Sequence, residues 1–140
     1  MFFFLSDNMA WLASFAIRKD QGFRLSTDEV QLLSWFNEKE NEGYVVISED
    51  PDLSYMATVY SPLRAWCSHW GNTPSRKSRE EELNDFYHEG RFLDVWRKSA
   101  VLIVFTKDSL SKEAALPPER DGPKFQNGTF TVFRLAPKTN

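Results

Sequence analysis

The feature that most constrains the fold is the apolar run from Ala100 to Phe105, which contains no polar side chain. A run this short and rich in branched residues predicts a buried strand, because a buried helix would be longer. A second run, from Tyr44 to Ser48, follows Gly43 and predicts another strand of the same kind. Segments with helical spacing separate the predicted strands. Such alternation implies crossover connections and a parallel sheet.

Capping signals place two of the helices. Ser26 or Thr27 can cap a helix whose apolar stripe runs from Val30 to Phe36, with Glu29 reaching back toward the cap. Asp50 is placed to cap a second helix that has Pro51 at its first position. The predicted order is helix 26–40, strand 44–48, helix 53–60, strand 63–68, helices 78–88 and 92–96, strand 100–105 and strand 130–135.

This order predicts an α/β fold, a small three-layer Rossmann-like sheet that is mostly parallel. No helix precedes the last strand, so we expect it to pair antiparallel with 100–105. We expect residues 26–140 to form one α/β domain and residues 1–25 to form an aromatic-rich lead-in. The apolar start, Met1 to Leu5, is too short to span a membrane by itself. One expectation is that it is the trailing end of a membrane helix, in which case the chain would be a piece of a longer protein.

Composition and missing motifs argue against several classes of function. The net charge of -3 argues against a protein that binds nucleic acid by neutralising phosphates. The glycines form neither a dinucleotide-binding fingerprint nor a phosphate-binding P-loop, and no GxSxG elbow is present. The histidines lack the spacing of metal ligands, so we expect neither a metal nor a cofactor. The single cysteine, Cys67, falls in a predicted strand, and we interpret it as a buried apolar residue.

The candidate site follows from the predicted sheet. Ligands of open α/β sheets bind beyond the carboxyl ends of the strands. We expect three loops to meet there: 49–52, 68–74 with the arginines just beyond it, and 106–108. They would bring carboxylates, a histidine, an indole and basic groups to one edge. The alternative is that these are ordinary solvated loop residues.

Several short motifs resemble one known family. They are Val45 to Asp50, Leu53 to Ser61, Arg64 to Trp70, Asn72-Thr73-Pro74 with Arg79, the pair Phe86-Tyr87, and Ser6-Asp7-Asn8 through Trp11. These motifs are similar to the soluble C-terminal domain of some bacterial polytopic membrane proteins that resemble C-type glycosyltransferases, and the resemblance extends over residues 6 to 135. Ser68 stands where the family pattern has glycine. In such enzymes the membrane part carries the catalytic acid and the lipid-phosphate site, so the resemblance implies that this chain alone does not catalyse sugar transfer.

The resemblance implies a noncatalytic soluble domain that contacts a glycan or the membrane part, on the extracytoplasmic face. The candidate ligand-binding residues are Glu49, Asp50, Asp52, Arg64, His69, Trp70, Thr73, Arg76 and Arg79. Two alternatives stay open. One is a small soluble, cytoplasmic enzyme that uses His69 with Asp50 or Asp52 as an acid/base pair. The other is a stand-alone module that self-associates through the aromatic strand at 130–133.

Overall fold

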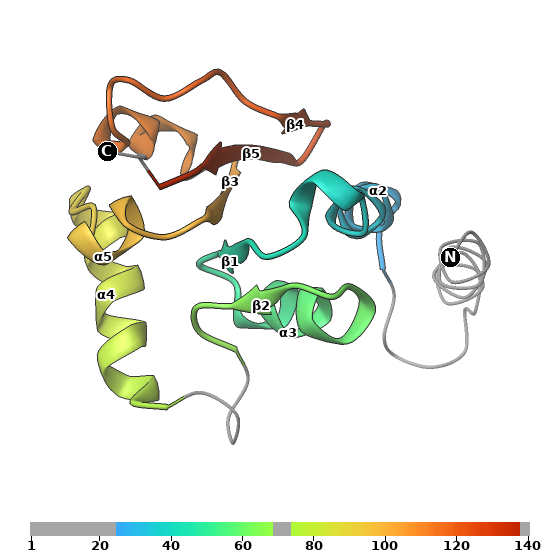
Figure 1. The fold of residues 1–140 in the computed structure, drawn as a ribbon, viewed down its shortest axis with the longest axis horizontal. Helices are drawn as coiled ribbons and strands as arrows, with labels where there is room; N and C mark the ends of the chain where they lie inside the picture. The colour runs from blue at the N-terminus through green and yellow to red at the C-terminus, as the bar shows by residue number, and fades with distance from the viewer. Residues whose placement is uncertain (1–24, 69–73, 138–140) are drawn as a thin grey trace.

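The computed structural model describes residues 25–68 and 74–137 of the chain. Figure 1 shows the path of the chain. The elements are α2 (Thr27–Phe36), η1 (Lys39–Asn41), β1 (Val45–Ile47), α3 (Pro51–Tyr60), β2 (Arg64–Ala65), α4 (Arg76–Glu89), α5 (Asp94–Arg97), β3 (Val101–Thr106), η2 (Leu110–Ala115), β4 (Phe125–Gln126) and β5 (Phe130–Leu135), in which η1 and η2 are 3₁₀ helices.

The five strands form one mixed sheet in the order β2-β1-β3-β5-β4. β2, β1 and β3 run parallel, whereas β5 runs antiparallel to both β3 and β4. The prediction of a mostly parallel, Rossmann-like sheet is therefore wrong. The longest ladder is the antiparallel one between β3 and β5, which extends from the pair Val101–Leu135 to the pair Thr106–Phe130.

A hairpin at the end of the described chain accounts for the antiparallel half of the sheet. β4 is only two residues long, too short to give a sequence pattern, and it was not predicted. Asn127 fixes the turn that follows, because its side-chain oxygen accepts hydrogen bonds from the backbone N–H groups of Thr129 and Phe130. The Asn127 amide also donates to the backbone oxygen of Asp28 at 3.0 Å, which ties the hairpin to α2.

The predicted strand at 63–68 is shorter than expected. β2 ends at Ala65, although the N–H of Trp66 still donates to the Val46 carbonyl at 2.9 Å. Beyond that point α4 holds the chain. The Trp66 indole N–H donates a hydrogen bond to the Glu82 carboxylate. The backbone carbonyl of Trp66 accepts a hydrogen bond from the Arg79 guanidinium. These contacts turn the segment away from the sheet, so Cys67 is buried, as predicted, but lies outside any strand.

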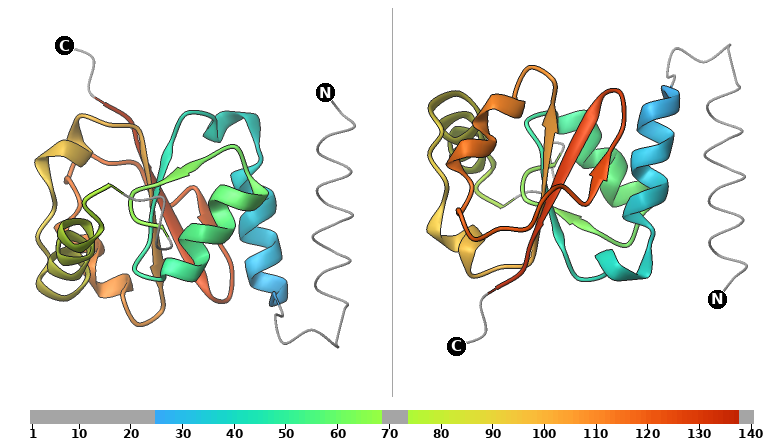
Figure 2. Two further views of the ribbon diagram at one scale, coloured as in Figure 1. Left: turned by 90° about the horizontal axis from the view of Figure 1, so that it is seen from below. Right: turned by 90° about the horizontal axis from the view of Figure 1, so that it is seen from above.

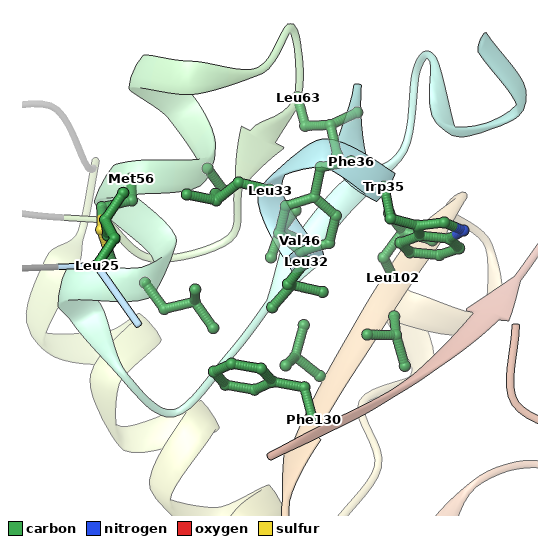
Figure 3. Packing of buried hydrophobic residues seen from close by; sticks show 14 residues of the cluster. Leu25, Leu32, Leu33, Trp35, Phe36, Val46, Met56, Leu63, Leu102 and Phe130 are labelled. Carbon is green, nitrogen blue, oxygen red and sulfur yellow. The ribbon is translucent and has the colours of Figure 1, made fainter. Parts of the chain in front are cut away.

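Helices cover both faces of the sheet (Figure 2), with α2 and α3 on one face and α4, α5 and η2 on the other. The α2 and α3 face is mainly aliphatic, and Figure 3 shows Leu32, Leu33, Val46 and Leu102 packed among its rings. The opposite face is aromatic. There the Phe86 ring lies edge-on to Trp96, with 5.3 Å between the ring centroids. Two separate cores thus fix the sheet between helical layers.

The start signals of two helices were predicted correctly. Ser26 caps α2, since its hydroxyl oxygen accepts a hydrogen bond from the Glu29 N–H at 3.1 Å, and the hydroxyl donates in return to the Glu29 carboxylate. Asp50 caps α3 by accepting from the Asp52 N–H at 2.9 Å, with Pro51 in the first turn. Local chemistry therefore fixes where the helices on this face begin.

Two expectations concern the surfaces of the domain. β5 lies between β3 and β4, and Phe130, Val132 and Phe133 are buried, so this stretch is not the open edge on which the self-association hypothesis relied. The predicted lead-in lies outside the described residues, apart from Leu25, which is buried in the core beside α2 and α3. None of the helices within 25–68 and 74–137 has the length and apolar character needed to cross a bilayer.

Candidate functional site

The carboxyl ends of the three parallel strands do meet at one end of the sheet. Glu49 follows β1, and its carboxylate accepts a hydrogen bond from the Thr106 hydroxyl at the end of β3, with 3.5 Å between the oxygens. Cys67 follows β2 and lines the same cavity as Glu49. Two of the three predicted loops therefore meet at the end of the sheet where open α/β sheets bind ligands, and Cys67, just before the third predicted loop, lines the cavity there.

A cavity of about 270 Å³ lies between these strand ends and α4. Its buried floor consists of Cys67, Leu83 and Tyr87. Exposed side chains form its rim, namely Glu49, Pro51, Glu80, Asn84 and His88. The rim therefore offers carboxylate, amide and imidazole groups above an apolar floor, which is the usual make-up of a site for a small polar ligand.

Three of the rim residues form a polar stripe on α4. Glu80, Asn84 and His88 are spaced by four residues, and side chains at this spacing lie on one face of a helix. Sequence reasoning missed all three because the helix appeared to be solvated on its polar side. The stripe, adjacent to the apolar Leu83 and Tyr87, was the signal that could have identified them.

Tyr87 links α4 to the ends of β1 and β3 by hydrogen bonds beneath the cavity. Its hydroxyl lies 2.6 Å from the carbonyl oxygen of Val104 in β3 and 3.1 Å from that of Ile47 in β1. Burial, followed by the negative charge of Glu49, raises the pKa of Tyr87 well above its usual value. The phenol therefore remains protonated at neutral pH and acts as a fixed hydrogen-bond donor to the sheet.

Cys67 is the only thiol of the chain and lies in the cavity floor. Burial raises its pKa, and the carboxylate of Glu80 raises it further. A nucleophilic cysteine needs the opposite environment, one that stabilises the thiolate. Cys67 is thus a neutral apolar group at neutral pH.

The acidic residues predicted for the site have separate roles. Glu49 lines the cavity, whereas Asp50 is occupied as the cap of α3. Asp52 is exposed in the first turn of that helix. Arg64 is exposed on β2, at the edge of the sheet, and does not line the cavity. Only one of these four predicted residues therefore belongs to the pocket.

The two predicted arginines of α4 act beside the cavity rather than in it. The Arg76 Nε forms an ion pair with Glu80 Oε1 at 2.6 Å and thereby orients a rim carboxylate. Arg79 stacks over the Trp66 ring, with 4.4 Å between its Cζ and the ring centroid. That indole also meets Trp96 edge-on, so it is part of the packing of the domain.

The remaining predicted site residues, His69, Trp70 and Thr73, lie outside the described residues. In the part of the chain that the structure does describe, no group of three His, Cys, Asp or Glu side chains is placed to hold a metal ion. The site is therefore built from what surrounds the cavity: two carboxylates, an amide and an imidazole.

Comparison of the chain with protein-family models, curated proteins and solved structures finds no match. The geometry of the site therefore carries the functional argument.

Proposed function

We propose that the chain is a noncatalytic binding domain of a membrane glycosyltransferase-like protein, and that its carboxyl-end cavity holds one sugar residue of a glycan. The observation that carries the binding role is the polar rim formed by Glu49 and the α4 stripe of Glu80, Asn84 and His88. A sugar hydroxyl both donates and accepts hydrogen bonds, and carboxylate, amide and imidazole groups can satisfy both functions. The attachment to a membrane protein is supported by the sequence resemblance alone.

The shape of the cavity supports a small amphipathic ligand. Pro51 and Leu83 supply apolar surface to the cavity, in addition to the polar groups of the rim. A sugar ring presents hydroxyls at its edge and C–H groups on its faces, so it can use both kinds of surface. A volume of about 270 Å³ favours one ring rather than an extended chain at this position.

The noncatalytic role is supported by the state of the reactive side chains. The Cys67 thiol is held in its neutral form by burial and by Glu80. Within the described residues, no carboxylate forms an ion pair with His88, so the imidazole has no partner of the kind that orients a general base. The rim groups are therefore arranged to form hydrogen bonds with a ligand.

A titration monitored by backbone amide NMR tests the proposal. The probes are glucose, galactose, mannose and N-acetylglucosamine, each added to the full chain. We expect at least one of them to shift the amide signals of residues 80–88 and 49–51 in a saturable way. Asn84→Ala removes a donor and an acceptor from the rim and should abolish that saturation.

Asp85→Ala is the matched control, because Asp85 is the next residue of α4, is exposed, and does not line the cavity. It should bind the sugar as the parent chain does. The proposal is overturned if none of the four sugars shifts these signals, or if Asn84→Ala and Asp85→Ala bind equally well.

A further inference from the structure

The turn between β4 and β5 contains Asn127 followed by Gly128, which is the only Asn-Gly pair in the sequence. Asparagine followed by glycine is the dipeptide most prone to deamidation. Glycine has no side chain, so nothing hinders the attack of its backbone nitrogen on the asparagine amide. Gly128 is exposed and Asn127 is half-buried, so water reaches this turn. The pair is therefore a chemically reactive position at the surface of the domain.

The reaction at such a pair forms a ring and then opens it. The backbone nitrogen of Gly128 loses its proton and bonds to Cγ of Asn127, and the side-chain nitrogen leaves as ammonia. Water then cleaves the succinimide ring. Cleavage between the nitrogen and Cγ gives aspartate, whereas cleavage between the nitrogen and the main-chain carbonyl carbon gives isoaspartate. Water is consumed and ammonia is released, without oxidation or reduction.

The folded protein holds the side-chain amide of Asn127 at both of its ends. Its oxygen accepts hydrogen bonds from the N–H groups of Thr129 at 3.0 Å and Phe130 at 2.8 Å. Its nitrogen donates to the backbone oxygen of Asp28 at 3.0 Å and to Oε1 of Gln31 at 3.3 Å. An amide held in this way resists the rotation and the loss of planarity that ring formation requires.

The backbone of the turn is held as well. The Asn127 N–H donates to the Phe130 carbonyl at 2.9 Å, and the Thr129 hydroxyl donates to the Asp28 carboxylate. A Cβ atom placed on Gly128 would lie 3.3 Å from Asp28 Oδ2, so this carboxylate packs against the glycine. Its negative charge disfavours loss of the proton from the attacking nitrogen. Contacts with α2 therefore oppose the reaction at both reacting groups.

The product of the reaction does not fit the same contacts. An aspartate at position 127 has no N–H group to donate, and its charge would face two acceptor oxygens, those of Asp28 and Gln31. The positive end of the α2 dipole offers little compensation, because Asp28 and Glu29 already occupy its first turn. Isoaspartate also lengthens the main chain within the turn. Both products therefore weaken the attachment of the hairpin to α2.

The hairpin lies where local opening is easiest. β4 is the edge strand of the sheet and is two residues long, paired with β5 only through Phe125–Val132 and Gln126–Thr131. Opening such an edge costs less free energy than unfolding the whole domain. The turn can therefore reach a reactive state while most of the domain stays folded.

We propose that Asn127 is a deamidation site that the contact of the β4–β5 hairpin with α2 protects. While the hairpin is docked, the hydrogen bonds of the amide prevent ring formation. When the hairpin opens, the pair reacts as it does in a free peptide, and the product cannot restore the contact. Deamidation is thus an irreversible mark of hairpin opening, and it is independent of the proposed sugar site.

Mass spectrometry of the full chain tests the protection. The chain is incubated at neutral pH in native buffer or in denaturing guanidinium, and trypsin then releases residues 125–134 as one peptide. We expect Asn127 to convert about tenfold faster or more in the denatured chain, because the reaction no longer waits for the hairpin to open. A synthetic peptide of residues 125–134 in both solutions corrects for the effect of guanidinium itself. Equal rates in the native and denatured chain overturn the proposal.

Two variants test the role of α2. Gln31→Ala removes an acceptor of the Asn127 amide, and Thr129→Val removes the donor to Asp28. Both side chains are exposed, so the fold is retained, and the native rate should rise severalfold while the denatured rate stays unchanged. Thr27→Ala, one turn earlier on the exposed side of α2, is the matched control and should react as the parent does. Equal native rates in all three variants reject the protecting contact.

A product mimic tests the consequence of the reaction. Asn127→Asp should lower the urea concentration at the midpoint of unfolding and shift the amide signals of residues 28–31. Gln126→Glu makes the same change from amide to carboxylate at the neighbouring exposed residue of β4, and it should unfold close to the parent. Equal midpoints in Asn127→Asp and Gln126→Glu would show that deamidation does not release the hairpin, and would overturn that part of the proposal.

Discussion

The two cavities at opposite ends of the sheet differ in how their polar groups are held. At the carboxyl end, the polar rim consists of exposed side chains of one helix and one loop above a neutral floor. At the other end, a cavity of about 520 Å³ lies between the end of α5, the loop at 117–121 and the C-terminal end of β5. The half-buried Arg120 beside it lies over the Phe133 ring, and the half-buried Arg134 lies over Trp35 on the opposite face of the sheet. The polar groups are therefore exposed to solvent at one end of the sheet and half-buried against aromatic rings at the other.

A buried polar side chain supports each half of the molecule, Asn41 in one and Tyr87 in the other. Asn41 is fully buried on the α2 face of the sheet, next to Arg134. It donates to the Trp35 carbonyl at 2.6 Å and accepts from Arg134 at 2.6 Å. At the carboxyl end the comparable support is Tyr87, which holds α4 against the strand ends but makes no contact with a charged donor. The buried support therefore contacts a charged side chain in the case of Asn41, whereas Tyr87 contacts backbone carbonyls.

The largest effect on stability should come from replacing the buried Asn41, with the exposed Asn84 as its comparison. Asn41→Ala removes the acceptor of the Arg134 guanidinium and one of the donors to the Trp35 carbonyl at a fully buried position, so we expect a loss of about 2 kcal/mol in the free energy of unfolding. Asn84→Ala, on the exposed rim, should change it by less than about 0.5 kcal/mol. Urea unfolding measures both. An equal loss of unfolding free energy in Asn41→Ala and Asn84→Ala would show that the buried asparagine supports the fold no more than the exposed one does.

A smaller loss is expected for Tyr87→Phe, about 1 kcal/mol at neutral pH, because two strand carbonyls lose their donor. The pH dependence adds a second measurement. The folded-state pKa of Tyr87 is raised, whereas a tyrosine in the unfolded chain titrates near about 10. Above that pH the unfolded chain binds fewer protons than the folded one, so stability falls as the pH rises.

The difference in unfolding free energy between the parent and Tyr87→Phe should therefore shrink as the pH rises from about 9 to about 11. Unfolding curves at several pH values test this. A constant difference across the range would show that Tyr87 does not resist ionisation in the folded protein.

The smallest effect concerns the electrostatics of the carboxyl-end cavity. Glu80→Gln removes a negative charge that raises the pKa of Cys67, so the pKa of the thiol should fall while burial keeps it above its usual value. The ultraviolet absorbance of the thiolate, followed during a pH titration, measures this. Glu81→Gln, on the neighbouring exposed residue, is the control and should leave the titration curve unchanged.

The sequence predicted the elements whose signals are local. The cap at Ser26, the cap at Asp50 and the apolar run of β3 all depend on residues close together in the chain. The sheet was predicted wrongly because β4 is only two residues long, and its pairing depends on the Asn127 turn and on the contact with α2. Alternating strands and helices predict parallel pairing only where no short hairpin intervenes.

The sequence predicted only part of the lining of the carboxyl-end cavity. The rule that ligands bind beyond the carboxyl ends of the strands led to Glu49, which lines that cavity. It could not find Glu80, Asn84 and His88, because which face of α4 turns to the sheet depends on packing of the aromatic core. Arg120 lies in the loop before β4 and Arg134 in β5, so the face of the sheet that each side chain reaches depends on the course of this hairpin.

The position of β5 also has a consequence for biosynthesis. This strand lies inside the sheet but is translated after every other described element. Until residue 135 has left the ribosome, one side of β3 is an exposed apolar edge, and α2 lacks the hairpin that binds it. The nascent chain therefore passes through a state that is prone to aggregation, and this domain can reach its native fold only after residue 135 has emerged.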